Sequence, residues 1–475
     1  MTKRVAHGRR GNRPASVPAR PRTLLLAMVC AAVMVVGGVA LKLDPSAAAP
    51  PPREPSRSTP PAGVSSPPPV TAPAPTTTVA PIPRSSRVGP PPLVPVPAGQ
   101  RPPQVVVVSF DGSGAAVDGT YPMYQFWRDV GRADRARMSF LLSGPYLLTH
   151  DQIGRYDAPQ LGAARQGLGL AVSGALGLRG LSQSQAVSAQ MVQLRDSVTE
   201  GHEIGTHFNG HICGQSRGSV ARFSATDWAQ ELRQFDNMVD QANVNNGLNP
   251  PIDLGFTSKD VVGSRTPCLE GDFHALYPVL AQHGYLYDTS PTGAATDWPH
   301  RGAATTGPTP LWVFPLTGIP LYGTHRSMLS MDYNLCYDQD GCQIDRSYPA
   351  AQTASWRQQA LDTYRQYFET SYGGNRAPVF LGNHFEMWHA GAYTDALAAF
   401  VHENCSKPEV ECVTYKELAL WLNQVPPDQQ AAWQAGQFPH LLDLRPPAYG
   451  QPVPGALVPQ PAVAVPGAGP GAASP

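Results

Sequence analysis

Apolar residues gather into short blocks along the middle of the chain, and several blocks end in an ionisable side chain. Residues 104–112 read Gln-Val-Val-Val-Val-Ser-Phe-Asp-Gly, an almost unbroken apolar run that ends at the carboxylate of Asp111. Residues 284–290 and 379–384 follow the same plan. Such runs are typical of strands buried on both faces of a parallel sheet. The pattern predicts an α/β fold, a β/α barrel whose chemistry lies at one mouth.

A longer apolar block with a basic flank precedes this region. Residues 24–41 are apolar throughout and follow seven lysines and arginines in residues 1–23. At about 1.5 Å per residue the block is just long enough to cross a membrane, and its positive flank is expected to stay in the cytoplasm. We therefore expect a cytoplasmic segment over residues 1–23, a transmembrane anchor over residues 24–41 and an extracytoplasmic location for the rest. A cleaved signal peptide, giving a secreted protein, is the alternative, because small residues stand at 47–49.

Proline marks the segments on either side of the central region. Residues 42–103 are rich in Pro, Ala, Ser and Thr, a composition that cannot bury a core and favours a disordered, extended linker. At about 3.1 Å per residue the linker would reach on the order of 150 Å from a membrane, which suits a substrate in a cell wall. Residues 425–475 form a second tail, rich in Pro, Gly and Ala. Residues 104–424 are left, enough for one large barrel domain.

The most informative polar motif lies in residues 201–211, Gly-His-Glu-Ile-Gly-Thr-His-Phe-Asn-Gly-His. It places His207 and His211 four residues apart, so that on one helical turn, or in a tight loop after a strand, both imidazoles can bind one metal ion. It is not the zinc-peptidase motif, because His202 and His207 are one residue too far apart and Glu203 would not face a shared metal. Histidines on a surface loop, or hydrogen-bonded in a core, are the competing interpretation of the bare spacing.

In this order the segments resemble the polysaccharide deacetylases, the metal-dependent family that removes N-acetyl groups from chitin-like and peptidoglycan glycans. The resemblance covers residues 104–423, and the Gly-His-Glu-Ile-Gly-x-His-x-x-x-His run is its most specific part. It implies a distorted β/α barrel and hydrolysis of an N-acetyl amide with release of acetate. It also implies a polysaccharide substrate and a divalent metal ion, for which we expect Zn²⁺.

The same resemblance implies a role for particular residues of this chain. By their motifs, Asp111 is the general base, Arg265 pairs with this carboxylate, and His384 is the catalytic acid. The metal ligands carry over to His207 and His211. A divalent ion lowers the pKa of a bound water, and positioned side chains then move the protons. The residues implied around the substrate are Asp288, Asp297 and Trp298.

One position departs from the family pattern. The family's first motif reads Thr-Phe-Asp-Asp, and its second aspartate binds the metal, whereas this chain has Gly112. Losing a carboxylate ligand lowers the affinity for a divalent ion unless another oxygen donor replaces it, and the candidates are Asp118 and Glu386. Alternatively, Asp111 itself binds the metal ion, and another residue acts as the general base. The alternatives to an active deacetylase are a catalytically impaired glycan-binding protein on the same fold and a different metal-dependent hydrolase, such as a peptidase.

Six of the seven cysteines lie in the central region, an even number that fits disulfides in an oxidising compartment. Sequence alone does not fix their pairing. Cys336 with Cys342 and Cys405 with Cys412 are close enough in the chain to close small loops. The third pair, Cys213 with Cys268, would join the histidine motif to the arginine motif, so we predict that it is bonded.

Charge removes one class of partner. The formal net charge is +0 at pH 7, and no basic stripe crosses the central region, so a nucleic acid is not an expected partner. The sequence has no internal repeat, and we expect a monomer.

Overall fold

The computed structural model describes residues 93–114, 123–161, 181–302, 310–343 and 346–438. The predicted transmembrane segment, Asp118, and most of the linker and tail lie outside these ranges. Among the helices that are described, none has the length and apolar character needed to cross a membrane. On this finding the expected membrane anchor, the membrane as a partner and the anchored extracytoplasmic location are withdrawn.

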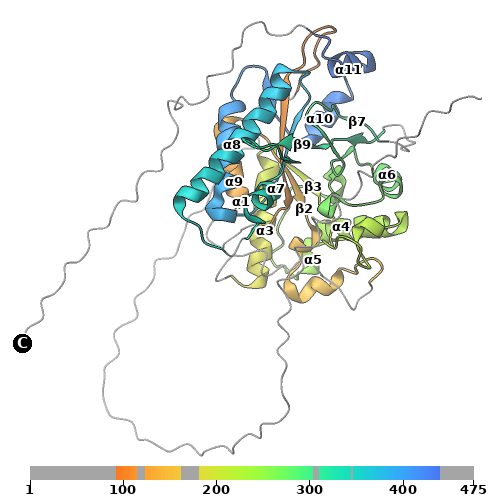
Figure 1. Cartoon of the computed structure of the whole chain (residues 1–475). Helices are drawn as coiled ribbons and strands as arrows, with labels where there is room; N and C mark the ends of the chain where they lie inside the picture. The colour runs from red at the N-terminus through yellow and green to blue at the C-terminus, as the bar shows by residue number, and fades with distance from the viewer. Residues whose placement is uncertain (1–92, 115–122, 162–180, 303–309, 344–345, 439–475) are drawn as a thin grey trace, which may run out of the picture.

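Strands run through the centre of the molecule and helices surround them (Figure 1). The strands are β1 (Gln104–Gly112), β2 (Ser139–Leu142), β3 (Glu203–Thr206), β4 (Gly263–Ser264), β5 (Tyr287–Asp288), β6 (Thr292–Ala294), β7 (His300–Arg301), β8 (Trp312–Val313), β9 (Leu316–Pro320), β10 (Ser327–Leu329), β11 (Val379–His384) and β12 (Val410–Cys412). The helices are α1 (Met123–Asp134), α3 (Gln183–Thr199), α4 (Ala225–Asp240), α5 (Ala242–Asn245), α6 (Phe273–Gln282), α7 (Asp332–Asp340), α8 (Ala350–Gly373), α9 (Trp388–Asn404), α10 (Tyr415–Leu422) and α11 (Pro427–Gln434).

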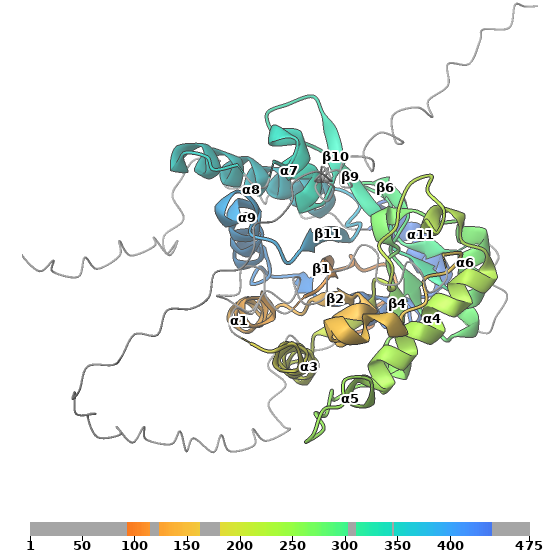
Figure 2. The ribbon, with the colours of Figure 1, turned by 90° about the horizontal axis from the view of Figure 1, so that it is seen from below.

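The main sheet is curled and mostly parallel. Its strands follow the order β11-β1-β2-β3-β4-β5-β8-β7, and β12 also pairs with β1; β7 alone is antiparallel to its neighbour. Seen from below, α1, α3, α4, α6, α8 and α9 lie around the outside of this sheet (Figure 2). A smaller sheet, β10-β9-β6, lies beside β11, to which it is joined by a bridge between Met331 and Gly382. The predicted α/β fold with a distorted barrel is confirmed.

The two faces of β1 explain where its carboxylate lies. The strand is buried along its length, as its apolar sequence predicted. Val106 and Val108 pack into one hydrophobic cluster, while Val105 and Val107 pack into the other. Because successive side chains of a strand point to opposite faces, Asp111 continues the odd-numbered series. It therefore stands at the carboxyl end of the strand, on the face that carries Val105 and Val107.

Three of the surrounding helices begin where a side chain bonds back to the backbone. Ser182 before α3, Ser224 before α4 and Thr414 before α10 each accept a hydrogen bond from the backbone three residues on, and the residue at that third position bonds back. These capping boxes satisfy backbone N–H groups that the first helical turn leaves without partners.

The folded domain extends beyond residues 104–424 at both ends. The indole N–H of Trp421 donates to the carbonyl of Val94, and that of Trp433 donates to the carbonyl of Gln100, each at 2.9 Å. Trp433 lies on α11, within the predicted tail. Residues 93–103 were assigned to the linker because their proline-rich composition cannot bury a core of its own. Here the tryptophans supply donors to its carbonyl groups, and the segment packs against the domain.

Candidate active site

Four polar side chains come together where parallel strands end. Asp111 and His384 are direct partners across β1 and β11. His207 follows β3 and Arg265 follows β4, and the backbone N–H of Arg265 donates to Thr206 at 3.0 Å. The curled sheet thus gathers at one mouth four residues that are far apart in the sequence.

The carboxylate of Asp111 is held by Arg265. Arg265 Nη1 donates to Asp111 Oδ1 at 2.7 Å, and both side chains are buried. The remaining guanidinium donors reach the backbone and hydroxyl of Thr289, each at 3.2 Å, and the hydroxyl of Tyr415 at 3.0 Å. Burial raises the pKa of Asp111, but the charge and hydrogen bond of Arg265, together with the charge of His384, outweigh it and hold the pKa below its usual value. Asp111 is therefore ionised at neutral pH.

His384 is paired with the carboxylate of Asp332. Asp332 Oδ2 accepts the backbone N–H of His384, and Asp332 Oδ1 lies 2.8 Å from Nδ1 of the ring. Burial lowers the pKa of His384, but the charge and hydrogen bond of Asp332 outweigh it, with help from Asp111, and raise the pKa to about 9. The imidazolium is therefore the neutral-pH form. Its side chain is 28% exposed, so it can reach a substrate.

Asp332 is a site residue that the sequence interpretation missed. It begins α7, where the bridge between Met331 and Gly382 brings the small sheet against β11. The run before it, Met-Leu-Ser-Met over residues 328–331, is much shorter than the apolar run that served as the signal for Asp111. The pair with His384 joins residues 52 positions apart and becomes visible only in the fold.

His207 and His211 lie in the loop after β3, not on a helix. Their ring centroids are 5.5 Å apart. Nδ1 of His207 lies 2.9 Å from the carbonyl oxygen of Arg265; a carbonyl only accepts, so Nδ1 carries the hydrogen and Nε2 keeps a lone pair. Burial lowers the pKa of His207 to about 3 and also lowers that of His211. Both rings are neutral, which is the form that binds metals.

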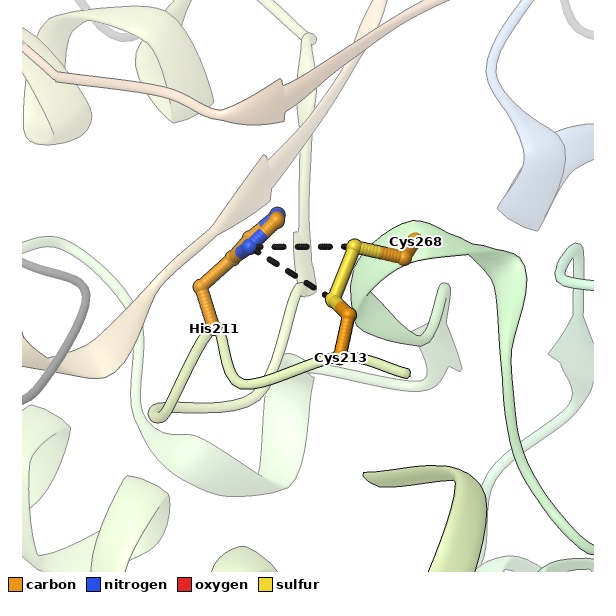
Figure 3. Close-up of side chains that lie close together, drawn as sticks. All are labelled: His211, Cys213 and Cys268. Atoms are coloured by element: carbon orange, nitrogen blue, oxygen red, sulfur yellow. Dashed lines mark hydrogen bonds between the residues drawn. A yellow bond between two sulfur atoms is a disulfide. The ribbon is translucent and has the colours of Figure 1, made fainter. Parts of the chain in front are cut away.

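The structure contains the three disulfides whose pairs were named from the sequence: Cys213–Cys268, Cys336–Cys342 and Cys405–Cys412. The first lies against His211 (Figure 3). Nδ1 of His211 is 3.8 Å from Sγ of Cys213 and 3.9 Å from Sγ of Cys268. This bridge joins the loop of His211 to the segment that follows Arg265.

Asp288 holds the segment around Arg265 through hydrogen bonds. Its Oδ1 accepts from the hydroxyls of Ser264 and Ser290, both at 2.8 Å, and Ser290 in turn accepts the backbone N–H of Thr266 at 2.8 Å. Burial raises the pKa of Asp288 to about 6, although these hydrogen bonds oppose the shift. Asp288 thus fixes the residues on either side of Arg265, and its oxygens are engaged there.

The structure does not bring the Asp297-Trp298 pair to the site. Asp297 is exposed and accepts the backbone N–H of Ala294 at 2.6 Å within a local turn. Trp298 is buried against Trp433, and its indole donates to Asn375, which lies before the start of β11. His384 is at the opposite end of that strand, so Trp298 packs at the far end of the barrel and not beside the catalytic groups.

The neighbouring pair in the histidine motif also points away. Nδ1 of His202 accepts the backbone N–H of Met138 at 3.1 Å. The carboxylate of Glu203 accepts from the hydroxyl of Ser139 at 2.7 Å and from the hydroxyl of Tyr287 at 3.1 Å. Glu203 therefore faces the barrel interior, in keeping with a spacing that does not match the zinc-peptidase motif.

Two imidazoles whose Nε2 atoms keep a lone pair fit a divalent ion, and the site needs a third protein ligand in addition to them. At Gly112 an added Cβ would lie 3.7 Å from the ring and hydroxyl of Tyr146, so the position offers space but no ligand atom. Glu386 is exposed and close enough to help raise the pKa of His384, so it stays a candidate. In the described ranges, two groups of three potential ligands occur, and each includes at least one disulfide-bonded cysteine, whose sulfur is already used. They are His211 with Cys213 and Cys268, and Asp340 with Cys336 and His389.

No protein-family model matches the chain, and no curated protein matches it. Its neighbours among solved structures include several polysaccharide deacetylases and an allantoinase. One described as a polysaccharide deacetylase from Mycobacterium smegmatis is 14% identical, with 71% of this chain and 96% of that chain covered and a TM-score of 0.42. The chitin deacetylase from Colletotrichum lindemuthianum is 12% identical, with 70% and 95% covered and a TM-score of 0.32. A mutant of a CE4 family pseudoenzyme with restored enzymatic activity is 8% identical, with 69% and 71% covered and a TM-score of 0.32.

Proposed function

We propose that the protein is a metal-dependent N-deacetylase that hydrolyses the N-acetyl amide of a cell-wall or related polysaccharide and releases acetate. One observation carries the proposal: an ionised aspartate and a protonated histidine adjoin the same pair of neutral imidazoles. The charge of Asp111 is close enough to act on the pKa values of His207, His211 and His384.

His207 and His211 would hold the ion through their Nε2 atoms. Zn²⁺ is the expected ion, because imidazole nitrogen suits it well. When bound, it would supply Lewis-acid polarisation of the amide carbonyl and of a water molecule.

The chain's own residues supply the proton transfers. Asp111 takes a proton from the attacking water while Arg265 keeps its carboxylate in place and ionised. As the new C–O bond forms and the C–N bond breaks, His384 gives its proton to the leaving nitrogen, and the products are acetate and a free amine. The base and the acid must hold opposite protonation states at one pH, and Arg265 and Asp332 are the partners that allow this.

Acetate release tests the proposal. The full chain is loaded with Zn²⁺ and incubated with chitooligosaccharides and, separately, with peptidoglycan. We expect acetate from at least one substrate and a loss of about a hundredfold or more in Asp111→Asn, which keeps the shape of the side chain but not its basicity. Release of peptide without acetate would instead identify the peptidase alternative.

Gly112 favours a second candidate, a glycan-binding protein on the same fold that has lost hydrolysis. Without a carboxylate here, the ion has fewer ligands and less charge compensation. Oligosaccharide binding with no acetate release, unrepaired by Gly112→Asp, would support this candidate over the deacetylase.

A further inference from the structure

The contact between His211 and a disulfide favours a hydrogen on one particular ring nitrogen. Both sulfurs of Cys213–Cys268 lie within 3.9 Å of Nδ1. Bonded sulfurs carry no hydrogen and can only accept, so the ring donates through Nδ1–H. Figure 3 shows this nitrogen turned toward the sulfur pair and the other ring nitrogen at the far end. Nε2 is then left with its lone pair.

The same arrangement holds the other imidazole. Nδ1 of His207 donates to the backbone carbonyl of Arg265. One short stretch of chain therefore supplies the acceptor for His207, at Arg265, and one of the two sulfurs against His211, at Cys268. The same stretch supplies the guanidinium that holds Asp111. Hydrogen bonds to the non-ligating nitrogen of a metal-binding histidine fix its tautomer and orientation.

We propose that the Cys213–Cys268 disulfide is a positioning group for the metal site, which keeps His211 in the Nδ1–H tautomer with Nε2 presented to the ion. The inference rests on the proposed function, since it assigns the disulfide a task within the same site.

The loop of His211 has other attachments, so this task is separable from holding the loop in place. The backbone N–H of Gly214 donates to Glu270 at 2.7 Å, and Gly210 packs closely against the ring of Tyr156. Removing the sulfurs should leave these contacts while freeing the imidazole to rotate and change tautomer. Metal affinity should then fall more than the stability of the fold.

Zinc titration of paired variants is the first part of the test. Cys213→Ala/Cys268→Ala is compared with Cys405→Ala/Cys412→Ala, a disulfide whose Cys412 pairs with Val106, at the other end of β1 from Asp111. We expect the first pair to bind Zn²⁺ about 10–100-fold more weakly than the wild type, the usual effect of losing such a supporting partner. The control pair should keep the wild-type affinity. Circular dichroism on heating verifies that both variants are folded.

The tautomer is read directly by nitrogen NMR of labelled histidines, at neutral pH and without metal. We expect the Nδ1–H form for His211 in the wild type and a shift toward the Nε2–H form in Cys213→Ala/Cys268→Ala. An Nε2–H wild-type ring, or equal Zn²⁺ affinity in the folded variant, would overturn the proposal. If that variant does not fold, the wild-type tautomer still decides. A wild type that binds no Zn²⁺ and releases no acetate counts against the proposed function, while the metal-free tautomer reports on the disulfide alone.

Discussion

Asp111 and His384 are neighbours across two strands, yet each is held in the protonation state that the other lacks. Asp111 has an arginine against one oxygen, and His384 has an aspartate against one ring nitrogen. An opposite charge within a few ångströms favours the ionised form of a group, and at this site it outweighs the opposing effect of burial on both residues.

The pH profile should depend on Asp332. The pKa of His384 is raised to about 9 mainly because Asp332 outweighs burial, so the acid stays protonated until the pH approaches that value. In Asp332→Asn the pKa should fall, and the alkaline limb of kcat/KM should move to lower pH by roughly one unit or more. The matched control is Asp340→Asn, which removes a carboxylate from the same helix but from a different histidine, His389. An alkaline limb at the same pH in Asp332→Asn would show that this carboxylate does not tune the acid.

Gly112 is a second residue at which a single substitution should change Zn²⁺ binding and acetate release. Its φ of +76° lies in the left-handed region, where aspartate and asparagine are tolerated better than most residues, and the space toward Tyr146 is open. If a missing carboxylate is the only defect, Gly112→Asp should bind Zn²⁺ about tenfold or more tightly and release acetate faster. Gly112→Asn, with nearly the same shape and no charge, is the control. No gain in Gly112→Asp, together with loss of the ion in Glu386→Ala, would show that Glu386 already fills the position.

At the scale of elements, the loop that carries His207 and His211 is hydrogen-bonded to α4. The backbone N–H and side-chain amide of Asn209 donate to Glu231 at 3.1 and 2.6 Å, and the hydroxyl of Tyr156 donates to the same carboxylate. Glu231 is fully buried, so its carboxylate needs protein donors. Some of these donors come from the loop that carries the proposed metal ligands.

Removing this carboxylate should destabilise the domain. In Glu231→Ala, buried donors of Asn209 and Tyr156 lose their acceptor, which costs about 1–3 kcal/mol for a group left unsatisfied. Urea unfolding measures the change, with the exposed Arg233→Ala on the same helix as control. Equal unfolding midpoints for the two variants would contradict the bond network.

Elements with a strong local signal were predictable and the others were not. β1 and β11 are continuous apolar runs, so their ends, Asp111 and His384, could be assigned before the structure. β4 is two residues long, and Arg265 was placed by its motif and not by periodicity. The strand before α7, β10, is only three residues long, and Asp332 was missed with it. Trp298 shows the reverse error, because a motif match does not reveal at which end of the barrel a side chain packs.

At the scale of the whole molecule, composition misplaced the domain boundaries. Proline-rich sequence indicates chain without a core of its own, but it cannot show whether another part of the protein supplies hydrogen-bond donors and apolar surface. In this protein Trp421 and Trp433 do so for residues 93–103. The six central cysteines were a better guide. The sequence did not fix their pairing, but the three candidate pairs are the bridges that the structure contains.

A chain that begins at Gln104 should therefore be less stable than one that begins at Leu93. The shorter chain loses the acceptors of two buried indole N–H groups and the apolar cover that Leu93 and Val96 give to the hydrophobic cluster of Val105 and Val107. A loss of about 2–4 kcal/mol follows from two unsatisfied donors and the exposed apolar area. Urea unfolding of the two chains measures it, and coincident curves would show that the segment contributes nothing.

The central claim is a division of labour, in which His207 and His211 hold the ion while His384 moves a proton. Zn²⁺ bound per chain, measured by elemental analysis on the wild type and on single alanine variants, tests it most directly. We predict near-stoichiometric Zn²⁺ in the wild type and in His384→Ala, and almost none in His207→Ala or His211→Ala, because removing one of few ligands sacrifices most of the binding energy. A wild type without Zn²⁺, or loss of the ion from His384→Ala as complete as from the other two, would contradict the account.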